Sequence, residues 1–160
     1  MRTLAVLSIA FLSAAAAAAQ SPVGPEWLGE WRLNVEKSVY NPGPAPYRRG
    51  RMKVAMVGDQ VRFAYDLVLP RGGIQHLEWT GRFDGNDYLV QGVDDYVTYA
   101  YSAIDARTYS VVTKVDGRTV AVTTVTMSED GRTLTSVTGG RNARGEEIVN
   151  TTVYEKVDVG

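Results

Sequence analysis

From Tyr47 onward, apolar and polar residues alternate in short segments that are separated by glycine-containing turns. Residues 61–69 are the clearest case, because every odd-numbered position in this segment is apolar or aromatic. A period of two residues is the pattern of a half-buried β-strand, in which successive side chains point to opposite faces. No segment of the chain after residue 20 shows the longer period of an amphipathic helix. The pattern therefore predicts an all-β protein.

The alternation places a first strand near Glu30 and further strands at regular intervals after it. The expected strands are residues 51–57, 61–69, 74–83, 88–90, 96–104, 108–115, 118–127, 133–138 and 148–157. Turn signals separate them, including Asp84-Gly85-Asn86-Asp87 and Asp116-Gly117, and the glycine pairs Gly72-Gly73 and Gly139-Gly140 are read as hairpin turns. A meander of about nine or ten short strands must close on itself or leave hydrophobic edges exposed.

Closure of that meander predicts an antiparallel up-and-down barrel of about 8–10 strands. A β-sandwich is the alternative, although its crossing connections are longer than most of those predicted here. Residues 38–46 contain three prolines and are expected to form an extended connection, because proline cannot donate to a sheet. Residues 20–160 are then one barrel domain.

The first nineteen residues have the three parts of a secretory signal. Arg2 supplies a positive charge, Leu4–Leu12 is a short apolar stretch, and Ala17-Ala18-Ala19 is a small-residue cleavage site. We therefore expect residues 1–19 to be removed on export, which makes the protein periplasmic or secreted. The apolar stretch is too short for a strong membrane-spanning helix, and no second one follows.

Composition narrows the range of partners and chemistries. The chain has no cysteine, which excludes disulfides, thiol catalysis and a cysteine-linked lipid anchor. Its 17 basic and 18 acidic residues are nearly balanced and form no basic stripe, so a nucleic acid partner is not expected. With a single histidine and no acidic metal-binding loop, neither a metal nor another cofactor is expected. The sequence leaves the oligomeric state open.

Short sequence motifs give the chain a resemblance to two groups of proteins. Gly29-Glu30-Trp31 matches the G-x-W signature that opens the first strand of lipocalins, and the meander after it is similar to the wider calycin group. The chain also resembles secreted bacterial proteins of unknown function through Trp31-x-Leu33-Asn34-x-x-Lys37-Ser38, Phe83-Asp84-Gly85-x-Asp87-Tyr88 and Asp130-Gly131-Arg132-Thr133-Leu134. The resemblance implies a lipocalin-like barrel that holds a small hydrophobic ligand, with Trp31 plugging one end.

Acid–base chemistry has one candidate constellation. His76 and Glu78 share one face of a strand, and a carboxylate neighbour can tune a histidine into a general base. If the protein is an enzyme, His76, Glu78 and Tyr99 are its candidate catalytic residues. Alternation favours another interpretation, because Trp79 faces inward only if His76 faces outward. His76, Glu78, Arg62 and Asp66 would then face outward and form cross-strand pairs on the surface.

Aromatic residues are the stronger candidates for a ligand site. Tyr65, Trp79, Tyr99 and Tyr101 occupy strand positions that can share the inner face, and each has an apolar body with a polar tip. The later strands are rich in threonine, which favours a wet cavity over a dry core. These four residues form the predicted binding site, and plain core packing is their alternative role.

The leading hypothesis is therefore a binding protein with a small hydrophobic or amphipathic ligand in the barrel. One alternative is a cofactor-free isomerase, cyclase or hydratase that works in the same barrel. Another is an envelope interaction or inhibitor protein, which a filled barrel with a large exposed apolar patch would favour.

Overall fold

The structure is a computed structural model that describes residues 23–158, and the predicted signal segment lies outside these residues. A short 3-10 helix, η1 (Pro25–Trp27), precedes ten strands. The strands are β1 (Gly29–Asn41), β2 (Arg49–Val57), β3 (Gln60–Val68), β4 (Ile74–Gly81), β5 (Tyr88–Gln91), β6 (Val97–Asp105), β7 (Thr108–Val115), β8 (Arg118–Met127), β9 (Thr133–Arg141) and β10 (Glu147–Lys156).

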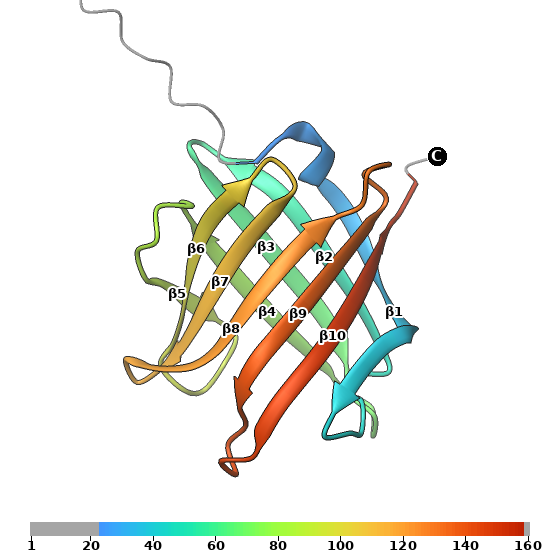
Figure 1. Ribbon diagram of the computed structural model, residues 1–160, viewed down its shortest axis with the longest axis vertical. Coiled ribbons are helices and arrows are strands. Elements are labelled where there is room, and N and C mark those ends of the chain that lie inside the picture. Colours follow the sequence, from blue (N-terminus) through green and yellow to red (C-terminus); the bar gives the residue numbers. More distant parts are fainter. Residues whose placement is uncertain (1–22, 159–160) are drawn as a thin grey trace, which may run out of the picture.

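The strands form one closed antiparallel barrel in which each strand pairs with its neighbours in sequence (Figure 1). The last strand, β10, pairs with β1 and closes the sheet, for example at Leu33 opposite Tyr154. The predicted up-and-down barrel is therefore confirmed, with ten strands. Because the sheet is closed, each of these ten strands has a partner strand on both sides.

Alternation along the strands sorts side chains between the barrel interior and the surface, as the sequence predicts. Val61, Phe63 and Leu67 on β3 are buried, whereas the residues between them are more exposed. On β4, Trp79 lies opposite Phe63 and is 1% exposed, and its ring centroid is 5.9 Å from that of Phe63. The buried core follows from this alternation. Most of its large side chains come from the first seven strands.

One end of the barrel, here named the capped end, is covered by η1. Trp31 at the start of β1 is fully buried there, and its indole Nε1 donates to the carbonyl oxygen of Trp27 at 3.0 Å. The ammonium nitrogen of Lys156 lies 4.7 Å from the centroid of the Trp31 ring and donates to the carbonyl oxygen of Glu26. Trp31 therefore plugs one end of the barrel, as the G-x-W motif implies.

A bulge in β1 gives a structural role to the Asn34-x-x-Lys37-Ser38 pattern. The pairing with β10 jumps from Asn34–Val153 to Val39–Thr151, so β1 holds extra residues there. The Asn34 side chain accepts from the Lys37 backbone amide at 3.0 Å, and the Ser38 hydroxyl accepts from the Val153 amide at 3.0 Å. The two side chains thus satisfy backbone groups that the bulge removes from the ladder.

The expected hairpin turn at Gly139-Gly140 is wrong. Both glycines belong to β9, and the turn follows them, with Gly145 donating to the carbonyl oxygen of Asn142 at 2.9 Å. Gly140 is needed for a close approach, because an added Cβ would lie 2.2 Å from the carbonyl oxygen of Val120 on the neighbouring strand. The expected connection at residues 38–46 is also corrected. Strand β1 runs to Asn41, so the proline-rich connection is shorter than expected.

Replacement of Trp31 by alanine should destabilise the barrel by about 3–5 kcal/mol, because a fully buried aromatic is lost and a cavity remains. Chemical denaturation followed by circular dichroism measures the change. Tyr96→Ala is the control, because Tyr96 is 60% exposed and should lower the free energy of unfolding very little. A loss below about 1 kcal/mol for Trp31→Ala would contradict the plugging role.

Candidate functional site

The middle of the barrel contains a cavity of about 140 Å³, here named the central cavity. Its lining consists of Met52, Tyr65, Tyr99, Tyr101, Tyr109, Val111, Thr123, Val125, Leu134, Ser136 and Tyr154. Seven of these eleven side chains carry a hydroxyl group, and none carries a charge. The lining therefore combines aromatic faces and aliphatic surface with several neutral hydrogen-bonding groups.

Rigid strands and aromatic packing hold the lining in place. Tyr101 on β6 packs against Trp79, with ring centroids 4.1 Å apart, and against Phe63 at 5.2 Å. The Trp79 indole donates to the carbonyl oxygen of Tyr99 at 3.2 Å, which fixes β4 to β6 where β5 is short. Gly81 makes room for this packing, because an added Cβ would lie 2.6 Å from the Trp79 ring.

The cavity tyrosines are uncharged at neutral pH, and burial extends this neutral state to higher pH. Desolvation raises the pKa values of Tyr65 and Tyr101 well above the ordinary 10.0, and it also raises those of Tyr99, Tyr109 and Tyr154. Each phenol therefore stays protonated at neutral pH and can both donate and accept a hydrogen bond.

Three of these hydroxyls are available to a bound molecule. Within residues 23–158, the hydroxyl groups of Tyr99, Tyr109 and Tyr154 have no hydrogen-bond partner. Every fully enclosed polar side-chain atom in the same residues is partnered, so these three hydroxyls border open space. By contrast, the Thr123 hydroxyl is already paired with that of Thr138 at 2.8 Å.

The structure brings together three of the four residues predicted to bind a ligand. Tyr65, Tyr99 and Tyr101 line the central cavity, whereas Trp79 lies outside its lining and supports Tyr101 from behind. The sequence interpretation missed Tyr109 and Tyr154. The pairing of Tyr101 with Val111 across the β6–β7 hairpin would have indicated Tyr109, because Tyr109 shares a face with Val111.

The candidate catalytic residues are not brought together. The His76 side chain is 73% exposed on the outside of β4, where its Nδ1 lies 2.5 Å from a carboxylate oxygen of Asp66. Glu78 faces the same way and pairs with Arg62 at 2.6 Å. Tyr99 lines the cavity on the other side of the sheet. The outward alternative is therefore the observed one, and these ion pairs belong to the surface.

A second cavity of about 300 Å³ lies at the capped end, under η1. Trp27 and Phe83 line it together with two carboxylates, Glu26 and Asp105. Tyr109 contributes to the lining of both cavities, and its ring centroid is 5.0 Å from that of Trp27. The second cavity is therefore more acidic than the central one.

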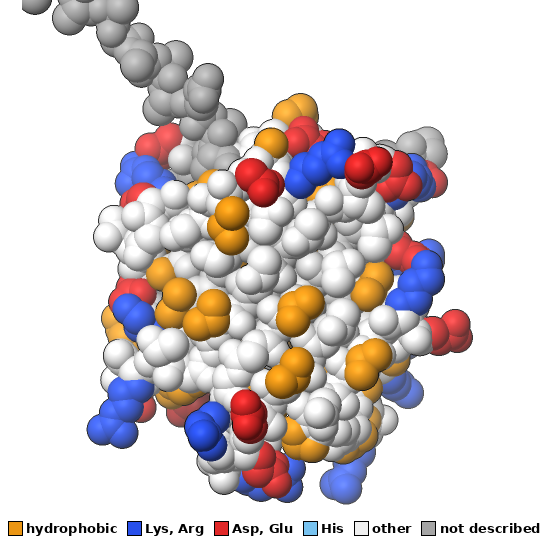
Figure 2. All heavy atoms as spheres, in the orientation of Figure 1, with side chains coloured by type: hydrophobic (Ala, Val, Ile, Leu, Met, Phe, Trp, Pro, Cys, Tyr) orange, Lys and Arg blue, Asp and Glu red, His pale blue; other side chains and the backbone are white. Residues whose placement is uncertain are grey.

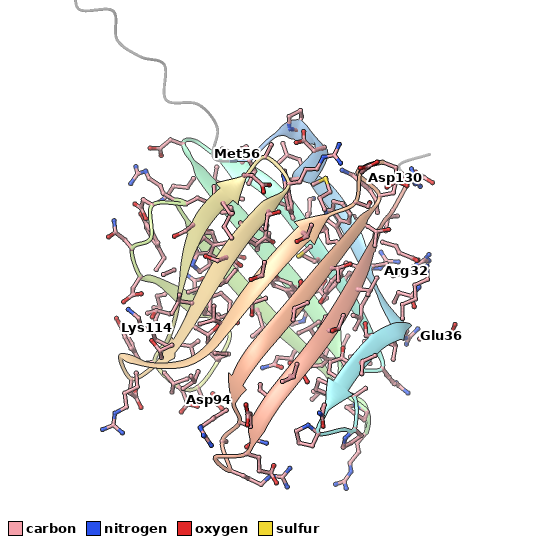
Figure 3. The ribbon with its side chains drawn as sticks, viewed as in Figure 1. Arg32, Glu36, Met56, Asp94, Lys114 and Asp130 are labelled. Atoms are coloured by element: carbon pink, nitrogen blue, oxygen red, sulfur yellow. The ribbon has the colours of Figure 1, made fainter. Side chains whose placement is uncertain are left out.

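On the face shown in Figure 2, the charged side chains lie mainly near the ends and sides of the barrel. Figure 2 shows a largely neutral face over β7–β10, with scattered hydrophobic side chains. Val122, Val137 and Val149 are exposed on β8, β9 and β10. Asp94 lies toward the barrel end opposite η1, and Lys114 and Arg32 point away from the interior (Figure 3). Asp94 and Asp95 are thus exposed loop residues.

No group of histidine and acidic side chains within residues 23–158 has the geometry to hold a metal ion. The same part of the chain contains no helix that is both long and apolar enough to cross a membrane.

Comparisons with known proteins identify the fold. No family model and no curated protein matches the sequence. Among solved structures, the barrel is similar to zebrafish ileal bile acid-binding protein in complex with cholic acid, with a TM-score of 0.51 and 12% identity. The match covers 82% of this chain and 99% of that one. The fold is therefore a calycin-like barrel.

Raising the pH should reveal the buried tyrosines. Because their pKa values are higher in the folded state than in the unfolded state, stability is fully present below pH about 10 and falls as the pH rises above it. Tyrosinate absorbance should therefore rise in two stages, the second together with the loss of near-ultraviolet circular dichroism. Ionisation of all nine tyrosines near their ordinary pKa in an intact barrel would contradict this prediction.

Proposed function

We propose that the protein is a periplasmic or secreted binding protein that holds a small hydrophobic or amphipathic ligand in the central cavity. The observation that carries this proposal is the internal space between tyrosine rings and aliphatic side chains, bordered by hydroxyls without protein partners. Sites for small molecules commonly have this composition, mostly apolar with a few placed polar groups. The signal-like residues 1–19 support export.

The fold neighbour adds support of a general kind. Zebrafish ileal bile acid-binding protein holds cholic acid, and its barrel covers most of this chain at 12% identity. At that identity the likeness concerns the fold, so the ligand must be argued from the lining residues of this chain.

Placement of the acid–base candidates argues against the enzyme alternative. A general base must come within hydrogen-bond reach of the bound molecule, and His76 and Glu78 lie on the opposite side of the sheet from the central cavity. The alternative of an interaction or inhibitor protein is also less favoured. A filled barrel would have favoured it, whereas this barrel contains the central cavity. The neutral face over β7–β10 is its remaining support (Figure 2).

A variant that fills the cavity tests the proposal. Toluene should bind the wild type and shift the NMR signals of cavity residues. Ser136→Phe should abolish these shifts, because the new ring would occupy the space that Ser136 now borders. Thr135→Phe is the matched control, since Thr135 is the adjacent residue of β9 and alternation points it outward.

The same titration tests whether the His76 face contributes to binding. His76→Ala should leave toluene binding unchanged, because His76 is on the outer surface. Loss of toluene binding in Thr135→Phe or His76→Ala, with Ser136→Phe unaffected, would overturn the proposed function.

A further inference from the structure

We propose that the ligand of the central cavity is an uncharged molecule about the size of one aromatic ring, carrying a hydroxyl or similar hydrogen-bonding group. This inference rests on the proposed function and names the chemical class of its ligand. Three observations carry it, namely the volume of the cavity, the charge of its lining and the unpartnered hydroxyls.

Volume limits the ligand to a single ring. The cavity measures about 140 Å³, close to the engineered cavity of about 150 Å³ that accepts benzene in another protein. Pockets for drug-sized molecules run from about 300 to 1,000 Å³. A steroid such as cholic acid is therefore too large for this space. A substituted benzene fills it.

The charge of the lining excludes ionic ligands. None of the eleven lining residues is a lysine, arginine, histidine, aspartate or glutamate. A carboxylate or ammonium group in this space would lose its hydration without gaining a counter-ion, which is strongly unfavourable. The charged residues of β3 and β4 cannot compensate, because Arg62, Asp66 and Glu78 are already paired with neighbours on the outer face.

The unpartnered hydroxyls call for a polar group on the ligand. Tyr109 is 4% exposed and Tyr154 is 9% exposed, yet their hydroxyls have no hydrogen-bond partner within residues 23–158. Tyr99 is in the same situation. A ligand hydroxyl would satisfy such groups by both donating and accepting, whereas a hydrocarbon of the same size would leave them unsatisfied.

Three ring compounds of similar size separate the charge classes. Benzyl alcohol is neutral, benzoate is an anion, and benzylamine is a cation at neutral pH. Calorimetric titration of the full-length mature protein should show benzyl alcohol binding at least tenfold more tightly than either ion, which is about 1.4 kcal/mol. Toluene, which lacks the hydroxyl, should bind more weakly than benzyl alcohol.

The other possible results of these titrations contradict either the inference alone or the proposed function as well. Benzoate binding as tightly as benzyl alcohol would overturn the inference and leave the proposed function standing. Tighter binding of benzylamine would also overturn it, because the tyrosine faces would then select a cation. Failure of both toluene and benzyl alcohol to bind would overturn the proposed function together with the inference.

Removing one hydroxyl tests the third observation separately. Tyr154→Phe should weaken benzyl alcohol binding several-fold and leave toluene binding unchanged, because only the alcohol uses the phenol. Tyr88→Phe is the control, since the Tyr88 hydroxyl donates to Asp84 on the exposed side at 2.8 Å. An equal effect of Tyr154→Phe on both compounds would show a merely structural role and contradict the assignment.

Discussion

Pairing of β10 with β1 is the constraint on which the rest of the structure depends. A closed sheet has only two faces, so each strand residue faces either the interior or the surface. The interior of the barrel has a fixed size, and side chains must fill it or leave a cavity. Trp31, Phe63, Trp79 and their neighbours fill the part near the capped end. The central cavity lies beyond them, where the inward residues of β8 and β9 are small.

The change in residue size along the inner face explains why the cavity lies where it does. Strands β3, β4 and β6 send aromatic residues inward, and these pack against one another. Strands β8 and β9 instead contribute Thr123 and Ser136, which are too short to reach the opposite wall. A single further aromatic on either strand would close the space. The hydroxyl groups of Thr123, Ser136 and the tyrosines make this space polar.

Sequence alone predicts most of the fold, because alternation and turn residues are local signals. Strands β3 and β7 were expected almost residue by residue, and the outward direction of His76 follows from the inward direction of Trp79. Gly140 was misread because its role is a close approach to Val120 on the next strand, which a local reading cannot detect. Tyr109 and Tyr154 were missed for a related reason, since only the register across several strands places them beside Tyr101.

The likeness to the bile acid-binding neighbour concerns the barrel architecture, whereas the cavity lining is a property of this chain. The same barrel can hold a large amphipathic acid or a small neutral ring, depending on how many inward positions carry large aromatics and whether any carries a charge. In this chain Tyr65, Tyr101 and Tyr109 occupy volume that a larger ligand would need. Their phenols are uncharged at neutral pH, and burial raises their pKa values further. The size and the polarity of the central cavity are therefore set by the same side chains. Exchanging one tyrosine for a smaller residue changes both properties of the cavity at once.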